Sequence, residues 1–123
     1  MRGFGDLEAA IMERLWDTDD AATGNELLDA LGPGRDIAYT TVTRALDNLQ
    51  RRGWLTRSRR GRAFVYRPTL TRAKYSADVM RDALQESGQS DAVLTHFVEQ
   101  MSPAETAALH SALLKLAGGG GAE

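Results

Sequence analysis

The sequence contains no cysteine. This absence excludes disulfide bonds, thiolate metal sites and thiol nucleophiles together, and it is typical of a protein that stays in a reducing interior. No apolar run approaches the roughly 20 residues that a membrane-spanning helix needs, and the first residues lack the apolar segment of a signal peptide. We therefore expect a cytoplasmic protein with no membrane partner.

Side chains that build catalytic or metal sites are also scarce. His96 and His110, the only histidines, lack partners at a spacing that suits zinc or a nucleophile with its base. Adjacent acids at Asp19 and Asp20 are typical of a turn. The glycine run at 118–121 lacks the lysine of a phosphate loop. We predict no catalytic residue, metal or cofactor, and 123 residues leave no room for a large enzyme fold.

The charge is segregated along the chain although the formal net charge is only −2. Residues 1–34 hold two arginines against eight acids, residues 35–74 hold eleven basic residues against two acids, and residues 75–123 hold two basic residues against seven acids. A local field attracts polyanions more than the chain total does. The basic middle third indicates a surface for nucleic acid.

The central element is a helix expected from about Tyr39 to Arg52. Val42, Leu46 and Leu49 recur at i, i+4 and i+7, which is one narrow apolar stripe. The opposite side carries groups that can contact base edges and phosphates. Gly53 stands where a left-handed cap ends the helix. The residues on that outward side are Thr40, Thr43, Arg44, Asp47, Asn48 and Arg51.

Two β-prone runs follow, 54–58 and 63–68, around a turn that contains Gly61. Upstream, a helix is expected from Asp6 to about Asp17, with Trp16 as a core residue that closes it against the next helix. The second helix, about 24–31, begins with a capping box of Thr23 and Glu26. Helix, turn, helix and basic hairpin together are the outline of a winged helix-turn-helix.

The C-terminal third reads as three helices with narrow apolar faces. Thr69 or Thr71 is available to cap the first, Asp91 the second, and Ser102 with Glu105 forms a capping box for the third, which we expect to end at Gly118. Narrow stripes favour packing against a second copy of the chain, which suits a two-fold symmetric DNA site. The alternative is that these helices pack back on the winged domain.

We therefore expect a mainly α fold with a small β-hairpin wing, in three parts: a winged helix DNA-binding domain at 1–69, a helical dimerisation region at 70–117 and a flexible glycine-rich tail at 118–123. The side chains expected to form the dimer share the apolar stripes of the three C-terminal helices. They are Ala77, Met80, Leu84, Leu94, Phe97, Val98, Met101, Leu109, Leu113 and Leu116.

The sequence resembles the BlaI/MecI/CopY transcriptional repressors, the penicillinase repressor family, over nearly its whole length. Residues 7–16, with Met12 and Trp16, are similar to the first helix of that family, and residues 39–49 with 52–55 to its recognition helix. Residues 61–68 are similar to its wing, and residues 97–99 with 102–105 to its C-terminal signature.

The resemblance implies a homodimer that binds palindromic operators and blocks transcription, with β-lactamase or cell-wall-stress genes as the expected targets. In the β-lactam-responsive branch a sensor-linked protease cleaves the repressor between Asn and Phe. The corresponding bond here is His96-Phe97, which lacks the asparagine. The copper-responsive branch uses C-terminal cysteines, so a copper sensor is excluded.

Candidate DNA contacts lie on the central helix and the hairpin. Thr40, Thr43, Arg44 and Asn48 are expected at base edges, and the resemblance adds Thr41. The hairpin arginines and Arg51 are expected at the DNA backbone. Two other functions stay open from sequence alone: a winged-helix protein-interaction module and a small hydrolase. The full candidate set is Tyr39, Thr40, Thr41, Thr43, Arg44, Asn48, Arg51, Arg57, Arg59, Arg60 and Arg62.

Overall fold

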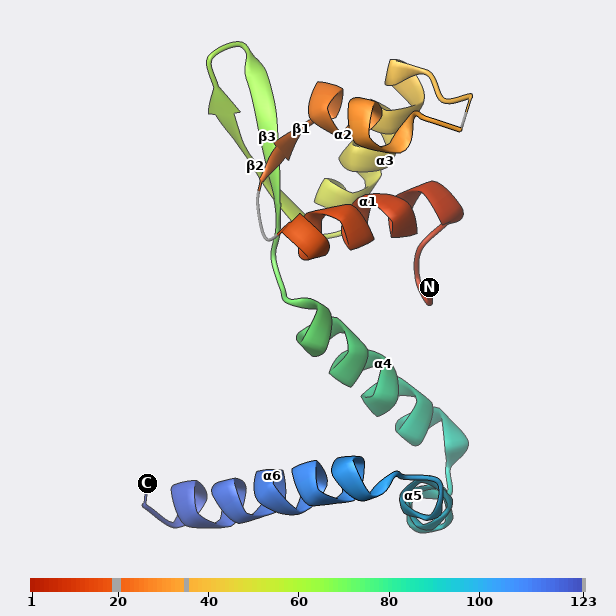
Figure 1. The fold of residues 1–123 in the computed structure, drawn as a ribbon, viewed down its shortest axis with the longest axis vertical. Helices are drawn as coiled ribbons and strands as arrows, with labels where there is room; N and C mark the ends of the chain where they lie inside the picture. The colour runs from red at the N-terminus through yellow and green to blue at the C-terminus, as the bar shows by residue number, and fades with distance from the viewer. Residues whose placement is uncertain (19–20, 35, 123) are drawn as a thin grey trace. The chain divides into compact units, whose positions relative to one another are not determined.

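The structure is a computed structural model that describes residues 1–18, 21–34 and 36–122, so the turn predicted at Asp19 and Asp20 lies outside the described residues. The chain divides into two compact units, Met1–Val79 and Met80–Glu123. Its elements, drawn in Figure 1, are α1 (Asp6–Thr18), β1 (Ala22–Thr23), α2 (Gly24–Leu31), α3 (Tyr39–Arg51), β2 (Leu55–Arg60), β3 (Ala63–Pro68), α4 (Arg72–Ser87), α5 (Ser90–Glu99) and α6 (Pro103–Ala122). The mainly helical class with a small wing is confirmed.

The ends of α2 and α3 follow the predicted caps. Thr23 Oγ1 accepts from the Glu26 N–H at 3.1 Å, and Glu26 Oε1 accepts from the Thr23 N–H at 2.8 Å, so the capping box is complete. Gly53 has φ +85°, and the Trp54 N–H donates to the Leu49 carbonyl at 2.9 Å. A glycine in the left-handed conformation followed by this hydrogen bond is a Schellman-type end, so α3 ends at Gly53 as expected.

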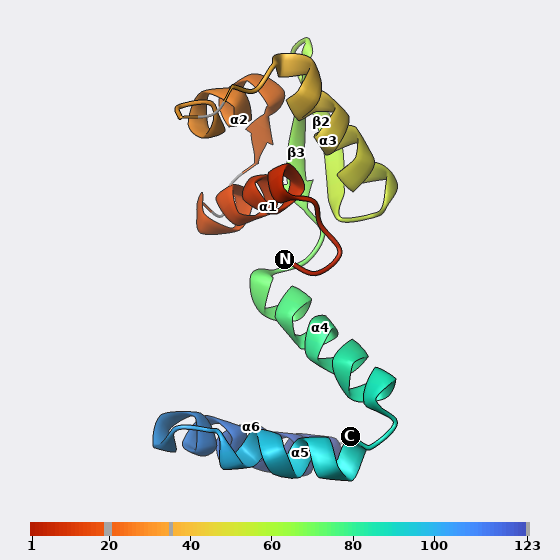
Figure 2. The same cartoon turned by 90° about the vertical axis from the view of Figure 1, so that its right-hand side faces the viewer.

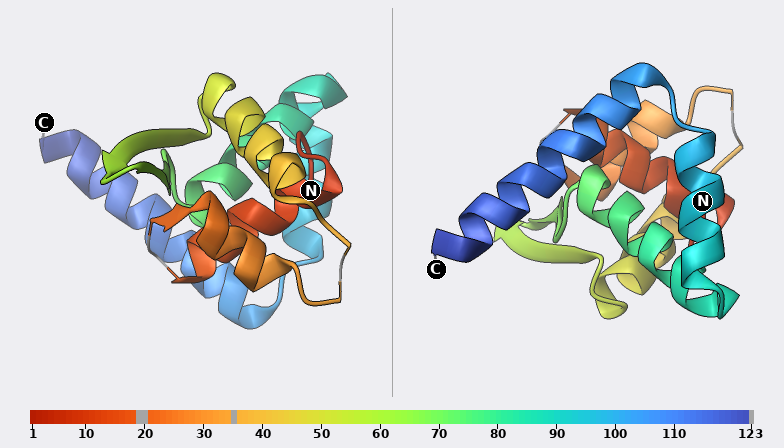
Figure 3. Two further views of the ribbon diagram at one scale, coloured as in Figure 1. Left: turned by 90° about the horizontal axis from the view of Figure 1, so that it is seen from above. Right: turned by 90° about the horizontal axis from the view of Figure 1, so that it is seen from below.

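The sheet has three antiparallel strands in the order β1-β3-β2. The hairpin register runs from Leu55 opposite Pro68 to Arg60 opposite Ala63, which leaves a two-residue turn at Gly61, where φ is +64°. The hairpin projects beyond the three helices of its unit (Figure 3, left), and α3 lies beside β2 (Figure 2). Strand β1 was not predicted, because two residues carry no recognisable strand pattern.

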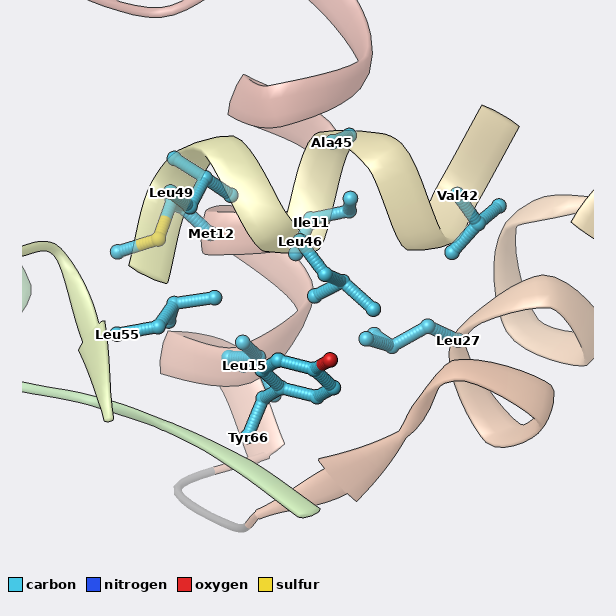
Figure 4. Close-up of a cluster of buried hydrophobic side chains, with 10 residues drawn as sticks. All are labelled: Ile11, Met12, Leu15, Leu27, Val42, Ala45, Leu46, Leu49, Leu55 and Tyr66. Carbon is cyan, nitrogen blue, oxygen red and sulfur yellow. The ribbon is translucent and has the colours of Figure 1, made fainter. Parts of the chain in front are cut away.

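One apolar core holds the first unit together. Figure 4 shows side chains from α1, α2, α3 and the sheet meeting in it. The predicted stripe of α3 is confirmed, since Val42, Leu46 and Leu49 have no accessible surface. Burial on this scale is the main stabilising force of a small unit. The members of the cluster are Ile11, Met12, Leu15, Leu27, Val42, Ala45, Leu46, Leu49, Leu55 and Tyr66.

An aromatic cluster attaches the start of α4 to the same unit. The Tyr75 ring lies 5.2 Å from Phe4, 5.5 Å from Trp16 and 5.7 Å from Trp54, measured between ring centroids. Trp16 packs against the core, as expected, and also contacts Tyr75 of α4, and its Nε1 donates to the Leu70 carbonyl at 3.0 Å. The first unit runs to Val79 and therefore includes the start of α4, beyond the expected boundary at residue 69.

Ion pairs reinforce that attachment. The Arg72 guanidinium lies 2.8 Å from a Glu13 oxygen and 2.7 Å from an Asp17 oxygen, so the first turn of α4 is tied to α1. The hydrogen bond to Asp17 raises the pKa of Arg72, which remains charged at any working pH. Thr71 Oγ1 accepts from the Lys74 N–H at 3.0 Å, which identifies Thr71 as the cap of α4.

The second unit contains the rest of α4 together with α5 and α6. The capping box of Ser102 and Glu105 is formed at 3.1 and 2.9 Å. Asp91 does not cap α5: that position belongs to Gln89, which makes no side-chain cap bond. The helix α6 continues to Ala122, so the prediction that it ends at Gly118 is wrong. Glycine costs about 1 kcal/mol relative to alanine in a helix, but it does not prevent helical dihedral angles.

A cavity in the core should be costly. Replacing Leu46 by alanine removes a fully buried side chain, and large-to-small changes of this kind cost about 2–5 kcal/mol. We expect a loss of that size in the free energy of unfolding, measured by denaturant titration. Thr41→Ala, on the exposed side of the same helix, is the control and should cost less than 1 kcal/mol, roughly. Equal losses for the two variants would contradict this account of the core.

Candidate nucleic-acid interface

An open groove lies between the outward face of α3, the start of α2 and the hairpin β2–β3, all within the first unit; we call it the α3 groove. The helix dipole of α2 places its positive end at this surface. The residues that line the groove are Thr23, Gly24, Asn25, Tyr39, Thr40, Thr43, Arg44, Asp47, Arg57, Arg62, Ala63, Phe64 and Tyr66.

The structure brings together part of the predicted set and leaves part outside. The groove contains Tyr39, Thr40, Thr43, Arg44, Arg57 and Arg62 of the candidates. The other candidates lie outside the lining but are exposed, so they can still meet DNA that extends past the groove. These are Thr41, Asn48, Arg51, Arg59 and Arg60.

Two arginines of the groove have no ion-pair partner among the residues that the structure describes. These are Arg44, on α3, and Arg62, in the turn of the hairpin. A guanidinium that is always charged and carries five donors suits both phosphate oxygens and guanine edges. Because neither pairs with a described carboxylate, both guanidinium groups keep their donors available at the groove surface.

Other arginines are held by carboxylates. Asp47 lies 3.1 Å from Arg51 Nη2 and 3.9 Å from Arg57 Nη1, and Arg51 also donates to Asn48 at 2.9 Å. The Arg57 and Arg59 guanidinium carbons lie 4.3 and 4.9 Å from the centre of the Phe64 ring. Cation–π contacts and exposed pairs contribute little to stability individually, but they limit where these side chains point.

The wing is connected to α2 through Glu26. Arg60 Nη2 donates to Glu26 Oε1 at 2.9 Å, the same oxygen that accepts from the Thr23 N–H. That backbone bond holds the pKa of the Glu26 carboxyl below its usual value, and Arg60 lowers the pKa further while desolvation opposes both. The carboxylate that completes the capping box of α2 thus also holds an arginine of the wing.

Comparisons with known proteins identify the family of this chain. The sequence profile of the family described as "Penicillinase repressor" matches residues 4–115. The chain belongs to the penicillinase repressor family. It is also 39% identical over 121 residues to the protein named "Transcriptional regulator BlaI" of Mycobacterium tuberculosis, an alignment that covers 96% of this chain and 88% of that protein. The repressor is therefore a transcriptional regulator rather than an enzyme, and the hydrolase alternative is excluded.

Solved structures with a similar backbone are more distant. MepR, a transcription regulator of the Staphylococcus aureus multidrug efflux pump MepA, is 21% identical, with a TM-score of 0.48 over 95% of this chain and 80% of that chain. A mutant of MarR from Escherichia coli is 20% identical, with a TM-score of 0.49 over 93% of this chain and 78% of that chain.

Sequence reasoning missed several groove residues of the repressor. Gly24 and Asn25 enter from the start of α2, and Phe64 from β3, which no helical pattern of α3 can indicate. A β-carbon at Gly24 would lie 3.4 Å from Tyr39 and from Thr43, so the glycine allows α2 to approach α3 closely. Asp47 lies on the predicted outward side of the helix but is not among the candidate contacts.

In the described parts of the chain, no three His, Cys, Asp or Glu side chains are grouped so that they could hold a metal ion. None of the described helices combines the length and the apolar character needed to cross a membrane. His96 and His110 are both exposed on helices of the second unit.

Acidification should lower the free energy of unfolding of the repressor, partly through protonation of Glu26. Because the folded pKa of this carboxyl is lowered, its stabilisation is complete above the unfolded pKa of about 4.3 and is lost as the pH falls through the folded value. Glutamine still suits a capping box, so Glu26→Gln should fold. We expect the variant to lose less stability than wild type between neutral pH and pH of about 3, measured by denaturant titration. Asp29→Asn, on the same helix, is the charge-matched control; parallel losses for Glu26→Gln and wild type would contradict the assignment.

Proposed function

We propose that the repressor binds palindromic operators as a homodimer, with α3 in the major groove and the hairpin β2–β3 at the backbone or minor groove. The observation that carries this proposal is the α3 groove, which combines short polar groups of α3 with two guanidinium groups that no described carboxylate pairs. A helix with its polar face outward and a basic wing beside it is the arrangement that reads duplex DNA. The family membership supports duplex DNA over a protein partner.

The roles follow from position. Thr40, Thr43 and Arg44 lie on the part of α3 that lines the groove, so we assign them to base edges. Arg57 and Arg62 come from the wing, and we assign them to phosphates together with the exposed arginines outside the groove. These are Arg51, Arg59 and Arg60, whereas Thr41 and Asn48 stay candidates for base edges. Tyr39, which lines the groove at the start of α3, is assigned to the DNA backbone.

The partner for dimerisation is a second copy of the chain, through the second unit. Its helices expose large apolar side chains, and within this unit α5 and α6 do not pack extensively on each other among the described residues. Apolar patches of this kind mark interaction sites. The exposed members are Met80, Leu94, Phe97, Val98, Leu113, Leu114 and Leu116, and Leu84, Met101 and Leu109 complete the stripes, with Ala77 on the part of α4 that belongs to the first unit.

We place the repressor in the cytoplasm, where its operator lies, and expect β-lactamase or cell-wall-stress genes under its control, with antibiotic resistance as the phenotype. Relief by a sensor-linked protease at His96-Phe97 stays a prediction from the resemblance. Both side chains are exposed, but the bond lies in the body of α5. A protease that binds extended chain has to unwind this helix before it cuts.

The direct test is to purify the repressor, incubate it with sheared DNA of the source genome near physiological salt, and sequence what it retains. An enriched palindrome upstream of β-lactamase or cell-wall genes supports the proposal in full, and a palindrome elsewhere supports a repressor with a different regulon. Without any enriched motif, sequence-specific binding is contradicted and a protein-interaction role of the same fold gains support.

Replacing Arg44 and replacing Arg60 should weaken DNA binding in different ways. Arg44→Ala should cost about 1–3 kcal/mol on the operator and reduce discrimination between sequences, because it removes a groove contact. Arg60→Ala should weaken all DNA about equally and lower the salt slope by about one. Both are measured by fluorescence titration over a salt series. A sequence-selective loss for Arg60→Ala, or an unchanged preference for Arg44→Ala, contradicts the assignment.

A charge in the apolar patch should separate the dimer. Phe97 is 43% exposed on α5, and replacing it by aspartate buries an unpaired charge in any interface there. We expect self-association to weaken about 30-fold or more, measured by analytical ultracentrifugation. Ala92→Asp, on the opposite side of the same helix, should leave the dimer intact. A dimer that survives Phe97→Asp would place the interface elsewhere.

A further inference from the structure

Asp47 places a negative charge in a surface built for a polyanion. Among the described residues that line the α3 groove, it is the one carboxylate. It follows Thr43 and Arg44 at i+4 and i+3, so it continues their row along α3. A carboxylate near phosphates is repelled by them, and this cost requires a compensating contact.

The carboxylate keeps an oxygen with free acceptor capacity. Oδ2 lies 3.1 Å from Arg51, whereas Oδ1 lies 3.9 Å from Arg57, which is longer than a hydrogen bond. The side chain is 47% exposed. A donor that enters the groove can therefore reach Oδ1 without breaking a hydrogen bond that already exists.

The edges of the bases in the major groove differ in what they offer to a carboxylate. Cytosine presents the amino group at N4, which donates. Guanine presents two acceptors and thymine presents a carbonyl oxygen, and both repel a carboxylate. Adenine presents a donor next to the acceptor N7, which is a poorer match. Of the four bases, cytosine suits Asp47 best.

We propose that Asp47 is a specificity-determining residue that accepts a hydrogen bond from the amino group of one cytosine in each half-site. The inference rests on the proposed function, since it requires α3 to lie in the major groove. The carboxylate also has a second effect. By repelling phosphates it lowers the affinity for DNA in which that cytosine is absent, so it increases the contrast between the operator and other sequences.

The experiment uses the full-length repressor and its variants. Each protein selects from a library of randomised duplexes near physiological salt, the bound fraction is sequenced, and titrations then compare the selected duplex with its single-base variants. Wild type should enrich a cytosine that Asp47→Ala no longer prefers, with the other positions unchanged. Replacing that cytosine should weaken wild type about 5-fold or more and leave Asp47→Ala unaffected.

Asp47→Asn provides a second measurement with a side chain of the same size. Asparagine suits adenine, to which it can both donate and accept. We expect the preferred base at this position to change from cytosine to adenine. We also expect Asp47→Asn to bind random-sequence duplex more tightly than wild type does. Persistence of the cytosine in both variants, or equal loss of preference at every position, overturns the inference.

Two further variants separate direct reading from other effects. Glu26→Gln removes one negative charge, as Asp47→Asn does. Glu26 also pairs with an arginine, Arg60 at 2.9 Å, but it lies outside the groove lining. The variant should therefore change the affinity for DNA without changing the selected motif. Arg57→Ala should retain the cytosine. If Arg57→Ala loses the same cytosine, Asp47 acts by positioning Arg57 and direct reading is overturned. If wild type itself enriches no motif, the proposed function fails, and the inference fails with it.

Discussion

Burial of one face of α3 determines where every functional side chain of that helix points. Val42, Leu46 and Leu49 have no accessible surface, so the helix cannot rotate about its axis without exposing them. Because successive residues on a helix are about 100° apart, fixing these three fixes the rest. Thr43 and Arg44 therefore project from α3 toward the α3 groove as a consequence of core packing.

The ion pairs around the groove are better explained by binding than by stability. Exposed pairs such as Glu26 with Arg60 and Asp47 with Arg51 are screened by solvent and contribute little to stability. Their effect on DNA is larger, because every carboxylate beside a guanidinium subtracts from the attraction to phosphates. A surface whose positive charge is reduced in this way binds arbitrary DNA less strongly, so base contacts determine more of its sequence specificity.

In the first unit, the sequence was sufficient where the controlling interactions are local, whereas in the second unit the local signals at Asp91 and Gly118 misplaced the start of α5 and the end of α6. Caps, the apolar stripe and Gly53 predicted α2, α3 and the hairpin, because each depends on residues within one or two turns. It was insufficient wherever partners are far apart in the chain. Strand β1 exists because Ala22 pairs with Tyr66, and the unit reaches Val79 because Tyr75 packs on Phe4 and Trp16. The candidate contacts on α3 could be predicted from the helical spacing of its residues. The groove residues from α2 and Phe64 could not, because their position depends on this same tertiary packing.

The two units meet different physical requirements. The first holds a complete core, whereas large apolar side chains such as Phe97 and Leu113 of the second are exposed. Their burial has to come from outside the unit, and in the proposed homodimer it comes from the partner. When two winged helix units are joined in one dimer, binding of the first to its half-site raises the effective concentration of the second at the other half-site. Separation of the dimer would then lower operator affinity steeply while each α3 stays folded and correctly oriented, so a signal received by the second unit can control transcription without disturbing the surface that reads DNA.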